Sequence, residues 1–392
     1  MRSLRIPKAE HRDRAADLLA QAESDGYDGV VLFSALNIHY TSGMYHLPTE
    51  RPCVLGITSD QIEAVVPRLE QQHAHDEQFL IDDVYVYFDY PQGKPMELVT
   101  DMCDSLGIAD GAIAVDSDGS PARNGYTGPA LSDVISGTVG VEDYVTQMRE
   151  CKSEIEIALI REASVWAHLG HSLLQAKIEP GRRPVTVGAE VETEATEIML
   201  DTLGERYVMM DWATPMTCKF TTGTVTARPH SVDQTTPITK GDNIVTIVKP
   251  SVGGYTTELE RTMFVGKPSE DQRKYFEIMR ESQEIAIEAI EPGTEYGGVE
   301  DVVMEYYHEQ GVHEYVQHHI GHNIGMQGHE RPFLDRSYEG TIRPGELYTV
   351  EPGFYIPEIG GFRHSDTVLV TENGTETLTY YPRTVDELTV DV

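Results

Sequence analysis

The chain has 392 residues, of which 40% are hydrophobic and 24% are charged. This length exceeds one average domain, so two domains are expected. Its 65 acidic residues outnumber the 30 basic ones, which gives a formal net charge of -35 at pH 7. Such a field repels nucleic acid and anionic membranes, and no apolar run approaches the roughly 18 residues of a membrane-spanning helix. Neither nucleic acid nor a membrane is therefore expected as a partner.

The acidic residues are spread along the whole chain rather than gathered in a tail, and lysine is scarce. In molar salt the Debye length falls to about 3 Å, which screens the self-repulsion of such a chain. Residues 1–8 lack the apolar core of a signal peptide. The composition therefore predicts a halophilic, cytoplasmic protein.

In chain order, the first part of the sequence predicts alternating helices and strands. Helices are expected over residues 9–25 and 96–106. Strands are expected over residues 29–33, 62–66, 84–88 and 112–115, with a further short strand and turn over residues 37–43. Alternation of this kind indicates an α/β domain, which we place at residues 1–146.

From residue 147 the pattern changes to longer helices separated by strand-rich segments. Ser153 is the expected N-cap of a helix whose apolar residues recur at helical spacing. Further helices are expected over residues 187–203, 270–290 and 298–310, and strands over residues 244–248 and 347–350. Helix pairs alternating with antiparallel strands indicate an α+β domain, residues 147–392.

Two glutamates, Glu258 and Glu260, lie two residues apart in an extended segment, so their side chains are expected on one face. Taken alone, such a pair indicates a solvated strand face. Three histidines further along the chain, set among glycines, favour a functional site instead: His318, His322 and His329. Imidazole is the commonest neutral metal ligand and the commonest acid or base near neutral pH.

Two more charged residues follow. Glu351 closes an expected strand just before Pro352, which suits a metal ligand or a general base. Arg363 lies on a further expected strand and could hold a substrate carboxylate or an oxyanion.

The order and spacing of these residues resemble the creatinase, prolidase and aminopeptidase P family, whose catalytic domains have the pita-bread fold. The resemblance is carried by His318-His319-Ile320-Gly321-His322, His329-Glu330, Glu351-Pro352-Gly353 and Arg363-His364-Ser365-Asp366. It implies an α/β N-terminal domain followed by an α+β pita-bread catalytic domain.

The family's peptidases hold two divalent metals with five ligands, and the resemblance implies that three of these positions keep ligand chemistry. They are Glu258, His322 and Glu351. The fourth falls at Ile247, or at Val248 if the register shifts by one, and the fifth falls at Ser365. The resemblance therefore implies at most one divalent ion (Mn, Zn or Fe) or a metal-free site.

Other residues take roles from the same resemblance. The implied catalytic residues are His230, His318, His329 and Glu260. Substrate binding would involve Glu260, Arg363 and Arg51. In creatinase the N-terminal domain reaches the active site of the partner subunit, so a role for Arg51 implies a homodimer.

The function implied is hydrolysis of a C–N bond, and two versions remain open. One is cleavage of a small Xaa-Pro peptide with a single metal ion. The other is creatinase-like hydrolysis of a small cationic amide without a metal. A third hypothesis, a non-catalytic binding protein on the same scaffold, has less support because binding alone gives no reason to keep this set of histidines.

Lowering the salt concentration is expected to unfold the protein. Moving it from about 3 M to about 0.1 M KCl lengthens the Debye length and exposes the acidic residues to mutual repulsion. The melting temperature, followed by circular dichroism, should fall markedly between the two buffers. An ordinary acidic protein would melt at nearly the same temperature in both.

Overall fold

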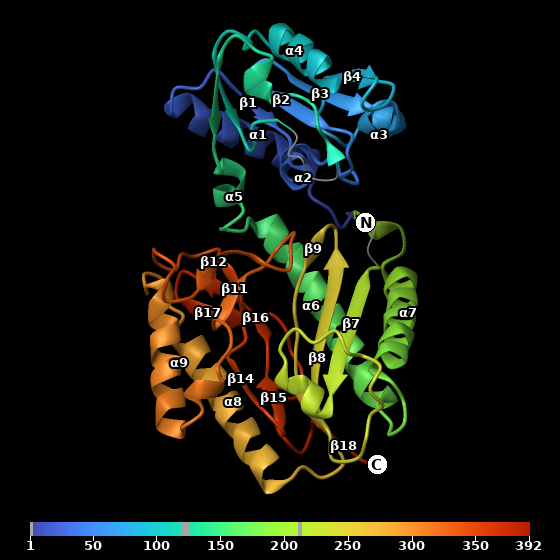
Figure 1. Cartoon of the computed structure of the whole chain (residues 1–392), viewed down its shortest axis with the longest axis vertical. Helices are drawn as coiled ribbons and strands as arrows, with labels where there is room; N and C mark the ends of the chain where they lie inside the picture. The colour runs from blue at the N-terminus through green and yellow to red at the C-terminus, as the bar shows by residue number, and fades with distance from the viewer. Residues whose placement is uncertain (1–2, 120–124, 211–213) are drawn as a thin grey trace. The chain divides into compact units, whose positions relative to one another are not determined.

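The computed structural model describes residues 3–119, 125–210 and 214–392 (Figure 1). The chain forms two compact units, Ile6–Arg149 and Glu150–Val392, with residues 3–5 joining the second. The sequence placed the boundary between residues 146 and 147, close to this division.

The N-terminal unit is built on a six-stranded sheet of order β4-β3-β2-β1-β5-β6. Its strands are β1 (Gly29–Leu32), β2 (Val54–Ile57), β3 (Ile62–Pro67), β4 (Asp83–Tyr87), β5 (Ala112–Val115) and β6 (Thr138–Val141). Its helices are α1 (Lys8–Ser24), α2 (Ala35–Ser42), α3 (Gln71–Ala74), α4 (Pro95–Ser105) and α5 (Tyr144–Met148). The strand β1 pairs antiparallel with β2 and parallel with β5, so the sheet is mixed.

Most expected elements of this unit are confirmed, but the strand expected over residues 37–43 is wrong. These residues lie in helix α2, just before which the backbone N–H groups of Phe33 and Ser34 donate to the carboxylate of Asp116. Asn37 also donates to Asp116, at 2.8 Å. A carboxylate some 80 positions away thus fixes the start of this helix, and no local pattern in residues 37–43 could show it.

The second unit contains two larger sheets and a hairpin. One sheet has the order β18-β10-β8-β7, with β9 paired to β8, and the other has the order β12-β11-β13-β16-β17. The strands of the first are β7 (Met216–Thr222), β8 (Asn243–Val252), β9 (Tyr255–Thr256), β10 (Thr262–Val265) and β18 (Thr389–Val390). Those of the second are β11 (Gly321–Asn323), β12 (Glu330–Leu334), β13 (Leu347–Val350), β16 (Asp366–Thr371) and β17 (Gly374–Thr377). The hairpin is β14 (Gly353–Ile356) with β15 (Gly360–Arg363).

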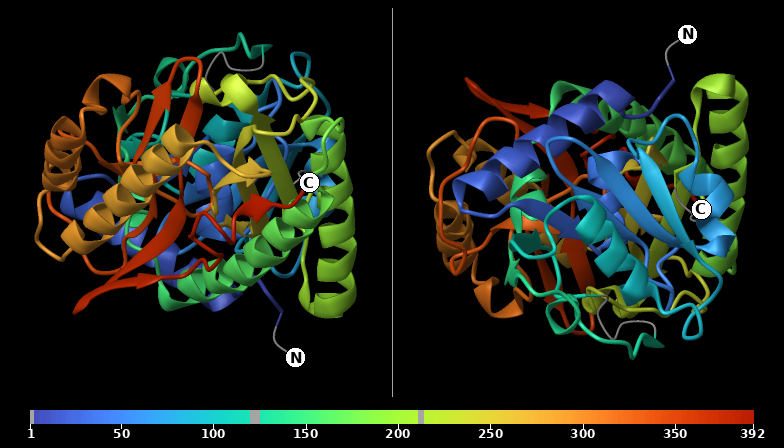
Figure 2. Two further views of the ribbon diagram at one scale, coloured as in Figure 1. Left: turned by 90° about the horizontal axis from the view of Figure 1, so that it is seen from below. Right: turned by 90° about the horizontal axis from the view of Figure 1, so that it is seen from above.

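Two helix pairs cover these sheets. They are α6 (Glu154–Lys177) with α7 (Pro184–Leu203), and α8 (Glu270–Ala289) with α9 (Tyr296–Gln310). The first pair packs on β7 and β8, and the second packs on strands of the other sheet and the hairpin, as Figure 2 shows from below. The predicted N-cap Ser153 is confirmed: its hydroxyl accepts from the backbone N–H of Glu156, whose carboxylate accepts from the N–H of Ser153.

A buried arginine joins the two sheets. Glu260 and Ser365 exchange backbone hydrogen bonds of 3.0 and 3.1 Å across an isolated bridge. Arg261 is fully buried, donates to the carbonyl oxygens of both residues, and pairs with Asp366 at 2.9 Å. Its guanidinium therefore holds the segments that carry the candidate site residues.

Among the described residues, no helix combines the length and the apolar character needed to cross a bilayer.

Replacing Arg261 with Met is expected to destabilise the catalytic unit by roughly 3–5 kcal/mol, because Asp366 would be left buried without its partner. Urea unfolding in concentrated KCl measures this loss. The control is Arg273→Met, which breaks the exposed pair with Asp386 and should cost less than about 1 kcal/mol. Equal losses in the two variants would contradict the role given to Arg261.

Candidate functional site

Three glutamates converge at one buried point of the second unit. One carboxylate oxygen each from Glu258, Glu260 and Glu351 lies within 4.8 Å of the others, and all three residues are buried. Glu258 and Glu260 come from the extended segment between β9 and β10, and Glu351 directly follows β13. The predicted proximity of the first two is confirmed, although their segment is irregular rather than a continuous strand.

A cationic group faces each of these carboxylates, as burial of so much like charge requires. The Lys249 ammonium forms an ion pair with Oε2 of Glu258. The Arg363 guanidinium engages both oxygens of Glu260, with Nη2 2.8 Å from Oε1 and Nε paired to Oε2. For Glu351, Nε of Arg363 lies 3.8 Å from Oε2.

The partner of the other oxygen of Glu351 is His322, whose Nε2 lies 3.1 Å from Oε1. Burial acts to lower the pKa of His322, but the Glu351 carboxylate outweighs it and the pKa is raised. Burial acts to raise the pKa of Glu351, but His322 and Arg363 together hold it well below its usual range. Each partner therefore favours the charged form of the other.

Burial and a neighbouring opposite charge also act in opposite directions on the pKa values of Lys249 and Glu260. Burial acts to lower the pKa of Lys249, but the Glu258 carboxylate overcomes it and the net pKa is raised. Burial raises the pKa of Glu260 while the Arg363 guanidinium opposes that change. Because that guanidinium bonds both oxygens of Glu260, we assign the residue as a carboxylate within this pair.

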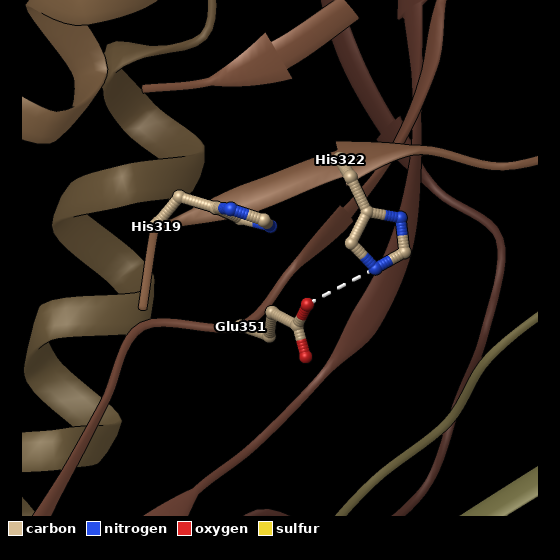
Figure 3. Close-up of side chains that lie close together, drawn as sticks. All are labelled: His319, His322 and Glu351. Carbon is tan, nitrogen blue, oxygen red and sulfur yellow. Dashed lines mark ion pairs between the residues drawn. The ribbon is translucent and has the colours of Figure 1, made fainter. Parts of the chain in front are cut away.

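A second convergence involves histidine donors. Donor atoms of His319, His322 and Glu351 lie within 4.8 Å of one another, and Figure 3 shows the three side chains directed toward a common space. His319 is half-buried and the other two are buried. These residues present two ring nitrogens and a carboxylate, the donor types that bind zinc and similar ions.

The remaining histidines of the motif lie beside this centre. His318 Nε2 is 2.7 Å from the hydroxyl of Tyr355, which accepts from Arg363 Nη1 at 3.2 Å. His329 stacks on His322 with ring centroids 3.8 Å apart. Burial lowers the pKa of both His318 and His329 to about 4, so both rings are neutral near pH 7.

One of the two donor groups fits a divalent ion, whereas two of the three carboxylates of the other are already paired with cationic side chains. His319, His322 and Glu351 offer three donors with room to converge. At the two further positions where the resemblance implies metal ligands, the chain has the apolar side chain of Ile247 and Ser365, whose hydroxyl donates to Glu258 at 3.2 Å. Neither supplies the carboxylate that would bind or bridge a second ion.

Two predicted residues lie apart from this centre. His230 is exposed on a turn, and within the described part of the chain no hydrogen bond or ion pair joins it to the buried cluster. Arg51 belongs to the N-terminal unit, where its guanidinium pairs with Asp89 at 2.6 Å and with Glu50 at 2.5 Å. The roles assigned to these two residues stay predictions.

Three residues of the centre were missed from the sequence. Lys249 could have been found, because a strand that presents Ile247 presents the residue two positions later on the same face. His319 was visible as the second member of a histidine pair but received no role. Tyr355 carried no signal, since a tyrosine in a short strand is ordinary core material.

Comparison with known proteins places these residues in context. Residues 158–372 match Metallopeptidase family M24, and residues 14–152 match the Creatinase/Prolidase N-terminal domain. The chain is 28% identical over 368 residues to an Xaa-Pro dipeptidase of Pyrococcus furiosus, covering 94% of this chain and 98% of that protein.

Solved structures agree on the fold. A dipeptidase from Mycobacterium ulcerans superposes with a TM-score of 0.81 at 25% identity, covering 99% of this chain and all of that one. The Xaa-Pro dipeptidase from Bacillus anthracis gives a TM-score of 0.82 at 23% identity over 97% of this chain and all of its own, a likeness of fold alone. The match to the family covers more than half of the sequence and includes every residue of the buried centre. The chain therefore belongs to Metallopeptidase family M24, with a creatinase/prolidase-type N-terminal domain and a pita-bread catalytic domain.

Proposed function

We propose that the protein hydrolyses the C–N bond of a small peptide, with Xaa-Pro dipeptides as the substrates to test first. The observation that carries the proposal is the buried convergence of three carboxylates with Arg363 and His322. Relatives named Xaa-Pro dipeptidase that match nearly the whole chain support the peptide class. A purely binding role would leave this buried charge without a purpose, so the non-catalytic hypothesis is not favoured.

Hydrolysis needs a positioned water, a cationic or hydrogen-bonding group for the oxyanion, and a proton for the leaving nitrogen. Glu351 and His322, whose Oε1 and Nε2 atoms lie 3.1 Å apart, present a carboxylate and a ring nitrogen beside which a water can be hydrogen-bonded. His318 is neutral and bonded to Tyr355, so it can exchange a proton at Nε2. Arg363 contacts Glu260, Glu351 and Tyr355. We infer that it positions these three side chains.

At most one divalent ion is proposed, held by His319, His322 and Glu351. Such an ion, when bound, polarises a carbonyl and lowers the pKa of a bound water. This set replaces Glu258 of the sequence-based ligand set by His319, because Glu258 already pairs with Lys249. The ions to test are Mn, Zn and Fe.

A second candidate function keeps the creatinase-like version of the hypothesis. Ile247 and Ser365 remove two carboxylate ligands, and Glu258, Glu260 and Glu351 form an acidic group suited to a cationic amide. The ion pairs made by Lys249 and Arg363 weigh against it, because they neutralise two of these carboxylates. Small cationic amides are included in the substrate panel so that this version is tested beside the dipeptides.

The test is a panel of Xaa-Pro dipeptides and small cationic amides, assayed in concentrated KCl with and without added Mn²⁺. Glu351→Gln should lower kcat/KM at least about 100-fold while leaving the fold intact, because it removes the charge paired with His322. The family resemblance implies that His230 transfers protons, so His230→Ala should also lower turnover.

The matched control is His313→Ala, a histidine of the same unit that stacks on His308 outside the buried centre. Its kcat/KM should equal that of the wild type. Full activity in Glu351→Gln would contradict the proposed site, and no turnover of any dipeptide would contradict the substrate class.

We also propose a homodimer, from the implied role of Arg51 at a partner's site. Light scattering in concentrated KCl should give about twice the 43.7 kDa of the chain. Arg51→Ala should keep this mass but lower turnover. A fully active monomer would contradict the proposal.

A further inference from the structure

We propose that the ammonium group of Lys249 takes the place of a divalent metal ion on the carboxylate side of the site, so that Glu258 is paired by charge and is not a metal ligand. The inference rests on the proposed site, but it does not depend on which substrate the protein hydrolyses. Lys249 has no part in the roles that the resemblance assigns.

The first support is the register of strand β8. Val248 is fully buried and faces helix α6, since a Cβ at Gly170 of that helix would lie 2.7 Å from Val248 Cγ1. Side chains alternate along a strand, so Ile247 and Lys249 share the opposite face, and both are only half-buried. The family's first ligand position therefore corresponds to Ile247 rather than to Val248, and the cation lies two residues further along the same face.

The second support is the place of the ammonium group. Lys249 Nζ pairs with Oε2 of Glu258, a residue that is only 2% exposed. On another side it faces the loop before His329, where a Cβ at Gly328 would lie 3.2 Å from Nζ. The absence of a side chain at position 328 thus leaves room for the lysine, whose own side chain is 22% exposed.

The third support is the charge of the centre. Lys249 and Arg363 supply two fixed positive charges against Glu258 and Glu260, and His322 pairs with Glu351. A divalent ion among these carboxylates would lie close to the ammonium and would be repelled by it. Without the ammonium, three carboxylates within 4.8 Å of one another would present a net negative charge and a set of hard oxygen donors.

The test counts Mn²⁺ ions bound to metal-stripped protein in concentrated KCl, using the electron paramagnetic resonance signal of the free ion. Lys249→Met should bind about one more ion per chain than the wild type, since it removes the charge and keeps most of the length of the side chain. The extra ion should disappear in the double variant Lys249→Met/Glu258→Gln. Lys249→Arg, which retains the charge, should bind the same number as the wild type.

The matched control is Lys177→Met, which removes a lysine of similar exposure that pairs with Glu194 between α6 and α7. It should leave the ion count unchanged. If Lys249→Met does not fold, the single variant Glu258→Gln tests the inference instead. It should bind the same number of Mn²⁺ ions per chain as the wild type.

Equal counts in the wild type and Lys249→Met, or loss of a wild-type ion in Glu258→Gln, would overturn the inference. These counts need no substrate. If the Mn²⁺ counts are as predicted but no dipeptide is hydrolysed, the proposed activity is refuted and the role of Lys249 is not. If dipeptides are hydrolysed but the Mn²⁺ counts differ from those predicted, the role of Lys249 is refuted and the activity is not.

Discussion

The candidate site depends on one buried guanidinium. Arg261 donates to the carbonyl oxygens of Glu260 and Ser365, which bridge the two sheets, and pairs with the carboxylate of Asp366. The segments that carry Glu258 and Arg363 lie on either side of this junction. A guanidinium can hold such a junction because its planar set of five donors bonds several acceptors at once, which an ammonium cannot do with fixed geometry.

A second constraint acts on the charges that this junction brings together. Three buried glutamates repel one another and lose hydration, so each needs a cationic side chain or a metal ion beside it. Here Lys249, Arg363 and His322 meet that need from three different segments of the chain. The protein thus stabilises a strongly acidic centre with its own side chains, which is consistent with the loss of ligand chemistry at Ile247 and Ser365.

Much of the fold could be predicted from local patterns. Ser153 and Glu156 form their capping box because both partners lie within one turn of the same helix. The strand at residues 112–115 was predicted to the residue, since a short apolar run forms its own element. Helix α2 was not predicted, because Asp116 fixes its start from a distant part of the chain.

By itself, the sequence determined the family, the order of the two domains and most of the residues that converge at the site. Motifs such as His318 to His322 and Glu351-Pro352-Gly353 identify the scaffold because the spacing of residues within a strand or turn is a local property. Only the tertiary structure decided which charges meet. It paired Lys249 with Glu258 and Arg363 with Glu260, and it brought His319 rather than Glu258 into the donor group with His322. These pairings join residues of separate segments, and their energy depends on burial and distance, which no local spacing contains.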